Sequence, residues 1–549
     1  MDEQVVLDRA VLDRAAVDRS ALLTSVIKAY DVRGVFGEQI DAALVRDIGA
    51  AFARLVLQGG STRAVVGHDM RESSPELAAA FAEGVLAQGM DVVQIGLAST
   101  DQLYFASGML DCPGAMFTAS HNPARYNGIK LCRAGAKPIG QDTGLAQIRA
   151  EVAERRPDRA STTTATITQR DVLTEYAQYL RDLVDCSQLR PLTVAVDAGN
   201  GMGGHTVPAV LGPLPGITVE PLYFELDGNF PNHEANPLDP ANLVDLQAHI
   251  RRTGADIGLA FDGDADRCFV VDERGRPVSP SAVTALVASR ALAKNPGASI
   301  IYNLITSRAV PELVRELGGT PVRTRVGHSF IKQEMAECGA VFGGEHSAHY
   351  YFQDFWYADS GMLAGLHVLA ALGEQDLPLS ELMAQYTRYA ASGEINSTVA
   401  DGAERTAAVC AAFADRTVAV DTLDGVTVDL ADGAWFNLRA SNTEPLLRLN
   451  IEAADDAAVV ALRDEVLAIV RQPTREEGAA MAVALDPQLM KILACPCDVH
   501  APLQLGTAED PAADALTCTS CGRSFPVIDG IPVLLLDEAL ETEDVPPTP

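Results

Sequence analysis

Short apolar runs alternate with amphipathic segments along the chain from about residue 25 to about residue 470. Examples are residues 64–67 followed by 75–88, residues 192–197 followed by a Gly-rich turn, and residues 298–302 followed by 307–317. Strand, loop and helix in this order are typical of βαβ units and of parallel or mixed sheets. At 549 residues the chain is also too long for one hydrophobic core. We therefore predict an α/β fold divided into several domains.

The charge balance limits the classes of partner. The chain has 42 Lys and Arg against 74 Asp and Glu, a formal net charge of −32, which disfavours binding to nucleic acid or to an anionic membrane. No window approaches the roughly 18 consecutive apolar residues of a membrane span. Residues 1–20 alternate in charge and lack the apolar core of a signal peptide. We expect a cytoplasmic protein with reduced cysteines and with no nucleic-acid or membrane partner.

The first motif suited to chemistry is Thr118-Ala119-Ser120-His121-Asn122-Pro123, which follows the apolar segment 115–117 and leads to Lys130. A serine held in a loop beside a histidine, an asparagine and a lysine suits covalent phosphoryl transfer. Its oxygen can carry the phosphoryl group while neighbouring donors stabilise negative charge. The alternative, from these residues alone, is an Asx-type turn without a catalytic role.

Three carboxylates, those of Asp262, Asp264 and Asp266, alternate in a tight loop after the apolar run 256–260. Carboxylates at this spacing can converge on one hard divalent cation and leave room for a phosphate oxygen. An EF-hand loop opens with the same spacing, but here Arg267 occupies the place of its sharp-turn glycine, and a strand-like run precedes the loop. A solvated acidic turn is the other alternative.

Two further loops have the composition of ligand sites. In residues 343–349, Glu345 and Ser347 are spaced to bond adjacent hydroxyl groups of a polar ligand, although a surface turn explains them equally well. In residues 439–445, an arginine, two hydroxyl residues and an asparagine suit a non-reacting phosphate, and an N-capping turn is the alternative. The residues of this second loop are Arg439, Ser441, Asn442 and Thr443.

In order and contents, the four motifs resemble the α-D-phosphohexomutase family over about residues 25–470, particularly its bacterial phosphomannomutase/phosphoglucomutase branch. Four more segments fit that family: residues 28–34, 67–74, 227–237 and 327–329. The resemblance implies four mixed-sheet α/β domains in a heart shape, with the site in a central cleft. We expect a leader at 1–24 and domains at 25–165, 166–275, 276–387 and 388–473.

The resemblance also implies a role for each matching residue. Ser120 is the expected phosphoserine, and Asp262, Asp264 and Asp266 are expected to hold Mg²⁺ with one of its oxygens. Lys130 and His328 are the candidates for proton transfer or charge stabilisation. The residues expected to line the reacting centre are Tyr30, Arg33, His121, Lys130 and Arg267. Those expected to bind the sugar hydroxyls and the distal phosphate are Glu345, Ser347, Arg439, Ser441, Asn442 and Thr443.

The implied reaction is a reversible transfer of a phosphoryl group between O1 and O6 of a hexose phosphate, that of mannose or glucose. It passes through a 1,6-bisphosphate, which is also the expected activator. A phosphoglucosamine mutase and a catalytically inactive scaffold are the alternatives. The 345–347 and 439–443 loops are closer to the hexose branch, and intact Ser120, Arg267 and the three aspartates argue against a scaffold.

Two positions depart from the family pattern. Ala348 stands where the sugar loop usually has glycine, and a positive φ there would cost an alanine about 1 kcal/mol. Ser360 stands where a second aspartate is common. Neither position belongs to the phosphoryl machinery, so both bear on the choice of sugar.

Four cysteines cluster near the C-terminus as Cys495-Pro496-Cys497 and Cys518-Thr519-Ser520-Cys521. Two close thiol pairs are typical of a zinc ribbon. Residues 489–497, 518–523 and 525–533 resemble the small zinc-ribbon family that partners methyltransferases, and Asp529-Gly530 predicts a hairpin turn.

The first cysteine pair has one intervening residue where ribbons usually have two. His500 as a substitute ligand and a metal-free mini-domain therefore remain alternatives to a four-cysteine zinc site. We expect a linker at 474–486, a zinc-ribbon-like β domain at 487–537 and a disordered tail at 538–549. The domain is either a passive appendage or a module that binds a protein partner.

Overall fold

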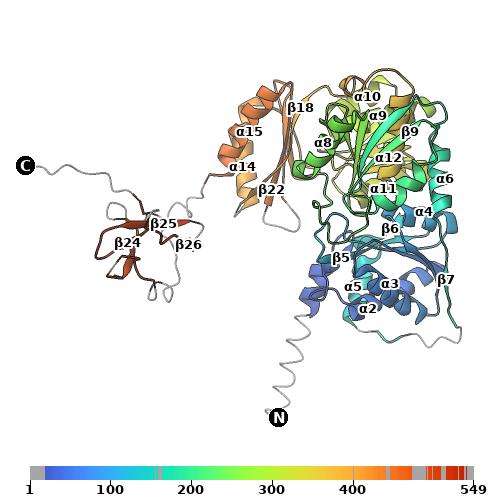
Figure 1. The fold of residues 1–549 in the computed structure, drawn as a ribbon, viewed down its shortest axis with the longest axis horizontal. Coiled ribbons are helices and arrows are strands. Elements are labelled where there is room, and N and C mark those ends of the chain that lie inside the picture. Colours follow the sequence, from blue (N-terminus) through green and yellow to red (C-terminus); the bar gives the residue numbers. More distant parts are fainter. Residues whose placement is uncertain are drawn as a thin grey trace, which may run out of the picture. The chain divides into compact units, whose positions relative to one another are not determined.

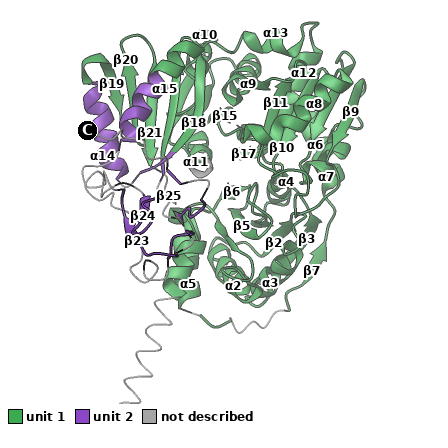
Figure 2. Cartoon of the chain, turned by 60° about the vertical axis from the view of Figure 1, so that its left-hand side comes forward, with its two compact units in different colours: residues 1–396, 414–442, 447–461 green, residues 397–413, 443–446, 462–549 purple. Residues whose placement is uncertain are grey.

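The computed structural model describes residues 19–154, 156–158, 164–399, 401–440, 446–472, 490, 493–497, 499–507, 513, 515–528, 531–536 and 539–540. The expected linker 474–486 lies outside these residues, as do residues 1–18 of the expected leader and 541–549 of the expected tail. The chain divides into two compact units (Figure 2). Unit 1 is Met1–Asn396, Ala414–Asn442 and Leu447–Ala461, and unit 2 is Ser397–Phe413, Thr443–Leu446 and Leu462–Pro549.

The first sheet has the strand order β1-β5-β4-β2-β3-β7, and β6 pairs with β5. Strands β2, β3, β4 and β7 are parallel, whereas β1 and β5 run antiparallel to their neighbours. The strands are β1 (Val32–Val35), β2 (Arg63–His68), β3 (Asp91–Leu97), β4 (Gly114–Phe117), β5 (Tyr126–Arg133), β6 (Lys137–Pro138) and β7 (Ile167–Gln169).

Alternation along these strands gives the first sheet two buried faces. Ala64 and Val66 face the core that the helices α2 (Ala42–Leu57), α3 (Ser74–Leu86) and α5 (Ala146–Ala153) also fill. Val65 faces the opposite core, which contains residues of α4 (Thr100–Leu110). Helices cover both faces of this sheet (Figure 1), and its central strands β2 and β4 accordingly bury successive residues, as strands between two helical layers do.

The second sheet, in the order β12-β11-β10-β8-β9, is parallel at β8, β9 and β10. Strand β11 folds back antiparallel on β10 with Phe261 opposite Cys268, so residues 262–267 form the turn between them. Its strands are β8 (Leu192–Asp197), β9 (Ile217–Leu222), β10 (Ile257–Phe261), β11 (Cys268–Asp272) and β12 (Pro277–Val278); the neighbouring helices in the chain are α6 (Leu173–Leu183), α7 (Gly203–Val210) and α8 (Val244–Thr253).

The third sheet has the order β14-β13-β15-β16-β17, parallel at β13, β14 and β15. Gly344 pairs with Tyr350 across β15 and β16, so residues 345–349 form a hairpin loop. Its strands are β13 (Ser299–Asn303), β14 (Thr320–Thr324), β15 (Phe342–Gly344), β16 (Tyr350–Phe352) and β17 (Ala358–Asp359); the helices are α9 (Pro280–Lys294), α10 (Ala309–Glu316), α11 (His328–Cys338), α12 (Gly361–Gly373) and α13 (Leu379–Ala384).

Two more sheets follow in the chain. The fourth has the order β18-β22-β21-β20-β19 and the fifth the order β23-β24-β25-β26. Ile528 pairs with Ile531, so antiparallel strands flank the expected Asp529-Gly530 turn, whose own residues lie outside the described part. The elements are β18 (Ala390–Thr398), α14 (Gly402–Ala412), β19 (Thr417–Asp421), β20 (Val426–Leu430), β21 (Trp435–Ala440), β22 (Leu446–Ala453), α15 (Asp456–Val470), β23 (Leu503–Leu505), β24 (Ala515–Cys518), β25 (Ser524–Ile528) and β26 (Ile531–Pro532).

The predicted fold class is confirmed: four α/β regions with mixed or antiparallel sheets precede a small C-terminal β domain. The three strand–helix successions read from the sequence are also present, as β2 with α3, β8 with α7, and β13 with α10. Among the described helices, none has both the length and the apolarity that crossing a bilayer requires.

A buried carboxylate, that of Asp101 in α4, joins three parts of unit 1. It accepts hydrogen bonds from the hydroxyl groups of Ser99, Tyr176 in α6, and Ser360 at the N-terminus of α12. Burial raises the pKa of Asp101 to about 6. This contact explains Ser360, since an aspartate in its place would put a second carboxylate against the fully buried Asp101.

Two glycines let backbones from different parts of unit 1 meet. A Cβ added at Gly263, in the turn after β10, would lie 2.4 Å from the backbone oxygen of Ser120. One added at Gly361, the first residue of α12, would lie 2.5 Å from the backbone carbon of Arg267. Backbone atoms cannot rotate away from such a clash, so these glycines set how closely the turn 262–267 approaches both neighbours.

Candidate functional site

Arg71 shapes the serine loop from beneath. Its guanidinium donates to four backbone oxygens of the loop, and its Nε bonds Asp69, which anchors it. The side chain is 1% exposed. The four backbone oxygens belong to Ser120, Asn122, Pro123 and Tyr126. The loop is therefore held in one conformation by a buried cation, which suits a residue that must be presented in a fixed position.

Ser120 lies at the meeting point of the serine loop and the acidic turn. Its backbone is in the left-handed region, with φ of 49°, and its N–H donates to the side-chain oxygen of Thr118. Its hydroxyl donates to Asp262 Oδ2 at 2.9 Å and lies 3.3 Å from His121 Nδ1. Non-glycine residues with positive φ often occur at functional sites, where surrounding contacts hold them there.

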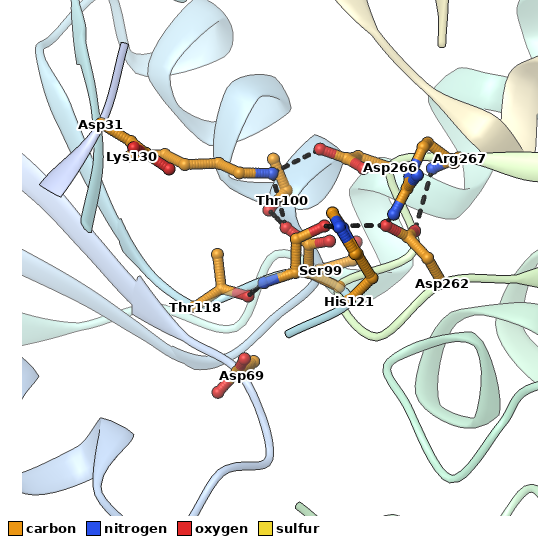
Figure 3. Close-up of polar contacts among 12 residues, drawn as sticks. Asp31, Asp69, Ser99, Thr100, Thr118, His121, Lys130, Asp262, Asp266 and Arg267 are labelled. Carbon is orange, nitrogen blue, oxygen red and sulfur yellow. Dashed lines mark hydrogen bonds and ion pairs between the residues drawn. The ribbon is translucent and has the colours of Figure 1, made fainter. Parts of the chain in front are cut away.

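The side chains of the three aspartates of the turn are at most 1% exposed and lie close together. Arg267 donates through Nε to Asp262 Oδ2 at 2.9 Å, and Lys130 donates to Asp264 Oδ2 at 2.7 Å and to Asp266 Oδ2 at 2.5 Å. Figure 3 shows Lys130 pointing toward Asp266 while Arg267 lies against Asp262. Two cations thus stand against three buried carboxylates.

The ionisation of these groups follows from burial and pairing. Burial raises the pKa of Asp262 to about 7, although Arg267 opposes the change. For Asp266, burial alone would raise the pKa, but Lys130 and its other neighbours outweigh it and the pKa lies below its usual range. Burial likewise opposes the charge on Lys130, yet Asp264 and Asp266 raise its pKa above the ordinary value. With Lys130 and Arg267 as the nearby cations, burial thus holds Asp262 toward its protonated form, and a further positive charge would favour ionisation of all three carboxylates.

The carboxylates fit a hard divalent cation. One oxygen from each of Asp262, Asp264 and Asp266 lies within 4.8 Å of the others. The Oδ1 atoms of Asp264 and Asp266 are buried and make no hydrogen bond among the described residues. Thr100 donates to Asp264 Oδ2, the oxygen that Lys130 also bonds, and so helps to fix that carboxylate. Magnesium prefers such oxygen ligands, usually from a few carboxylates, and takes a phosphate oxygen as well.

The loop between β15 and β16 lies near this centre. Ser347 Oγ is 3.0 Å from His349 Nδ1, and His349 Nε2 is 3.8 Å from Asp266 Oδ1. Glu345 is 2% exposed and its carboxylate is held by Tyr351 and Asn303. Contacts through His349 therefore link Ser347 to the acidic turn, and Glu345 lies in the same hairpin loop, held by Tyr351 and Asn303.

Ala348 has φ of +64°, so this position does need the left-handed backbone conformation. The departure from glycine therefore carries the strain of about 1 kcal/mol expected for an alanine. Its methyl group is fully buried, which returns part of that cost through packing.

Tyr30, Arg33 and Arg439 are also described. Arg33 donates to Asn122 and to Asp31, next to the serine loop. Burial raises the pKa of Tyr30, and the charges that act on it include Arg325, Arg439 and Glu345. Arg439 Nη2 lies 3.4 Å from Glu394. The side chain of His328 and the residues Ser441, Asn442 and Thr443 lie outside the described part, so their roles stay predictions.

Several residues of the site were not assigned from the sequence. They are Asp69, Arg71, Thr100, Asn303, His349 and Tyr351. His349 and Arg71 stand inside recognised motifs, so their polar character was a usable signal. Thr100 and Asn303 contact partners 164 and 42 residues away in the sequence, so nothing local marks them. Tyr351 lies only six residues from its partner Glu345, but it stands in an apolar strand and outside the recognised motif.

The four C-terminal cysteines form a cluster in unit 2. Cys495 Sγ is 3.7 Å from Cys521 Sγ, and Cys497 Sγ is 4.0 Å from Cys518 Sγ. A zinc ion with Zn–S bonds of about 2.3 Å holds its four sulfur atoms about 3.8 Å apart. The backbone N–H groups of Ser520 and Cys521 donate to Cys518 Sγ and lower its pKa to about 6.

His500 is not a member of this cluster. Its Nδ1 lies 3.2 Å from the backbone oxygen of Cys495, and the described group with metal-ligand spacing consists of the four cysteines. The single residue between Cys495 and Cys497 therefore does not prevent both thiols from facing the same centre. The four-cysteine interpretation fits zinc better than the one with His500.

Family models match five successive parts of the chain. The descriptions are phosphoglucomutase/phosphomannomutase alpha/beta/alpha domain I at residues 24–159, domain II at 174–275, domain III at 279–389, and the C-terminal domain at 394–469. A Trm112p-like protein model matches residues 486–530.

Similar proteins and structures agree with these matches. "Phosphohexose mutases" of Xanthomonas campestris is 42% identical over 441 residues, 80% of this chain and 97% of that protein. The phosphomannomutase of Escherichia coli K12 is 40% identical over 80% of this chain and 97% of its own. The structure of a phosphoglucomutase/phosphomannomutase family protein from Burkholderia thailandensis superposes with a TM-score of 0.74 and 35% identity, covering 81% of this chain and 97% of that one.

The cysteine cluster generates a prediction about metal content. We expect the purified chain to retain about one zinc ion per molecule after dialysis, because four thiolates at tetrahedral spacing bind zinc tightly. Cys518→Ser should lose most of it, while Cys186→Ser, which alters a buried cysteine of unit 1, should keep it. Elemental analysis by mass spectrometry measures both, and a Cys518→Ser protein with full zinc content would contradict the assignment.

Proposed function

This chain belongs to the phosphoglucomutase/phosphomannomutase family, and we propose that it moves a phosphoryl group between O1 and O6 of a hexose phosphate. The observation that carries the proposal is the contact between Ser120 Oγ and Asp262 at 2.9 Å. It puts a hydroxyl nucleophile, two cations and three buried carboxylates at one point.

The residues around Ser120 divide the work of phosphoryl transfer. Lys130 and Arg267 carry positive charge beside the carboxylates and would offset the negative charge of a phosphoryl group on Ser120. His121 stands within hydrogen-bond reach of the Ser120 oxygen, and burial keeps its pKa well below the usual value, so it is a neutral contact.

Asp262, Asp264 and Asp266 would hold a magnesium ion together with one phosphoserine oxygen, and that ion would supply the positive charge that the three carboxylates lack. The buried Oδ1 atoms of Asp264 and Asp266, which accept no hydrogen bond from the described residues, support this ligand set. Thr100 and Lys130 would keep the other oxygens of these carboxylates oriented.

The proposed reaction has two transfers. Phosphoserine 120 gives its phosphoryl group to the free hydroxyl of the hexose monophosphate; the Ser120 O–P bond breaks, a sugar O–P bond forms, and the hydroxyl proton goes to His328. Lys130 stays protonated between Asp264 and Asp266 and would offset negative charge instead. The resulting 1,6-bisphosphate turns over in the site, and its other phosphoryl group returns to Ser120. A trace of free 1,6-bisphosphate would regenerate phosphoserine and so act as activator.

Binding in two orientations demands contacts that serve both ends of the sugar. We assign the sugar hydroxyls to Glu345 and Ser347, and the phosphate that is not reacting to Arg439 with residues 441–443. Mannose and glucose phosphates are the proposed substrates. The identities of about 40% to proteins named phosphomannomutase and phosphohexose mutase support the hexose branch over an amino-sugar substrate.

A coupled assay with mannose 1-phosphate and glucose 1-phosphate tests the proposal. With Mg²⁺ and a trace of the matching 1,6-bisphosphate, the wild type should turn over at least one sugar. Ser120→Ala should lose at least about 10,000-fold in kcat, because the covalent route needs that oxygen. Ser107→Ala, which alters a buried serine of α4 away from the acidic turn, serves as the matched control.

Two results would contradict the proposal. Full activity of Ser120→Ala would remove the phosphoserine from the mechanism. Absence of turnover by folded, phosphorylated wild type with both sugars would redirect attention to an amino-sugar phosphate, the second candidate of the superfamily.

We also propose that the ribbon binds a protein partner. The Trm112p-like match and the exposed apolar side chains of Val499, Leu535 and Leu536 support a docking role. A pull-down with the full chain should recover a protein that a chain truncated after residue 485 loses. If the truncated chain retains every bound protein, the ribbon is a passive appendage.

A further inference from the structure

We propose that Tyr351 and Asn303 are positioning residues that fix the carboxylate of Glu345 for binding the sugar hydroxyls. This inference rests on the proposed function, because it concerns the sugar-binding role of Glu345. Each residue donates to a different oxygen: Tyr351 Oη to Oε1 at 2.5 Å, and Asn303 Nδ2 to Oε2 at 3.0 Å. One donor on each oxygen prevents rotation of the carboxylate and leaves a second lone pair on each for the ligand.

The two donors are themselves held in place. Thr306 donates to Asn303 Oδ1 at 2.8 Å, so the amide nitrogen of Asn303 is directed toward Glu345. Asn303 is fully buried at the end of β13. Burial raises the pKa of Tyr351 well above its usual value, so its hydroxyl keeps the proton that it donates.

Packing also fixes the ring of Tyr351. The Lys332 ammonium lies 5.9 Å from the ring centroid, and this ammonium is itself paired with Asp359 at 2.5 Å. The ring of His349 stacks on Tyr351 at an interplanar angle of 20°. Because His349 also bonds Ser347, the two sugar-binding residues share one support.

The charge environment of Glu345 favours ligand binding. Its contacts in the described part of the chain are with neutral donors, and no lysine or arginine pairs with it there. A carboxylate paired with a cation gives up part of its accepting strength to that partner. The carboxylate oxygens of Glu345 can therefore accept strong hydrogen bonds from sugar hydroxyl groups, while the hydrogen bonds from the two neutral donors offset the free-energy cost of burying the side chain.

The chain supplies a matched control for Tyr351. Tyr350 is its neighbour on β16, is equally buried, and has a hydroxyl group without a hydrogen-bond partner in the described part of the chain. Successive residues of a strand point to opposite faces, so Tyr350 points away from Glu345. Tyr350→Phe therefore removes the same atom from the same strand without touching the carboxylate.

The experiment compares Tyr351→Phe, Tyr350→Phe and wild type with glucose 1-phosphate and with its 2-, 3- and 4-deoxy analogues. Loss of one charge-assisted hydrogen bond should raise KM for glucose 1-phosphate about 10-fold in Tyr351→Phe and leave kcat nearly unchanged, because Glu345 binds substrate and transition state alike. In wild type, the deoxy analogue that lacks a hydroxyl bound by Glu345 should show a raised KM. In Tyr351→Phe that penalty should shrink, whereas in Tyr350→Phe it should persist.

The outcomes separate this inference from the proposed function. Equal KM values and equal deoxy penalties for Tyr351→Phe and Tyr350→Phe, in an active enzyme, would overturn the positioning role while the mutase stands. If wild type turns over no hexose phosphate, the proposed function fails. The positioning role of Tyr351 is then tested by calorimetry, which measures the binding of glucose 1-phosphate to wild type and to Tyr351→Phe. A binding constant that Tyr351→Phe does not change, or an absence of binding, would overturn the positioning role as well.

Discussion

Burial of three carboxylates in one six-residue turn is the constraint on which the rest of the site depends. Such a cluster is tolerated in a protein interior only if positive charge is brought to it. Arg267 comes from the turn itself, but Lys130 comes from β5 of the first sheet, so the charge balance requires that two sheets assemble against each other. Gly263 permits the backbone approach to Ser120 that this assembly needs. Ser120 is thereby brought into hydrogen-bond contact with Asp262 as a consequence of folding.

The same assembly organises the sugar loop. Asp101 in α4 accepts hydrogen bonds from the hydroxyl groups of Tyr176 in α6 and of Ser360 at the start of α12, and so links these two helices to α4. The first residue of α4, Thr100, donates a hydrogen bond to Asp264. His349 then stands between the sugar loop and Asp266. On the proposed function, recognition of the sugar and stabilisation of the transferring phosphoryl group would therefore use side chains linked to one another through buried polar contacts.

The sequence predicted the α/β class and brought Ser120, the three aspartates, Arg267 and Glu345 into view, because each lies in a motif whose local composition carries its chemistry. It did not predict Thr100, Asn303 or the Asp101–Ser360 contact, because these depend on partners distant in the chain. Tyr351 was also missed, although it lies only six residues from Glu345, because an apolar strand gives no sign that its hydroxyl bonds that carboxylate. For Ala348, the sequence left open whether the position needs a positive φ, and the structure shows that it does, with φ of +64°. The binding of the non-reacting phosphate by residues 441–443 remains a prediction from their motif.

The central claim is that Ser120 carries the phosphoryl group between the two ends of the sugar. The direct test is to incubate the dephosphorylated full chain with glucose 1,6-bisphosphate labelled in its phosphoryl groups, and to locate the label by mass spectrometry of peptides. The account predicts one labelled phosphoryl group on the peptide that contains Ser120, chased from the protein by unlabelled glucose 1-phosphate. Label on another residue, or a Ser120 phosphate that substrate cannot remove, would contradict it.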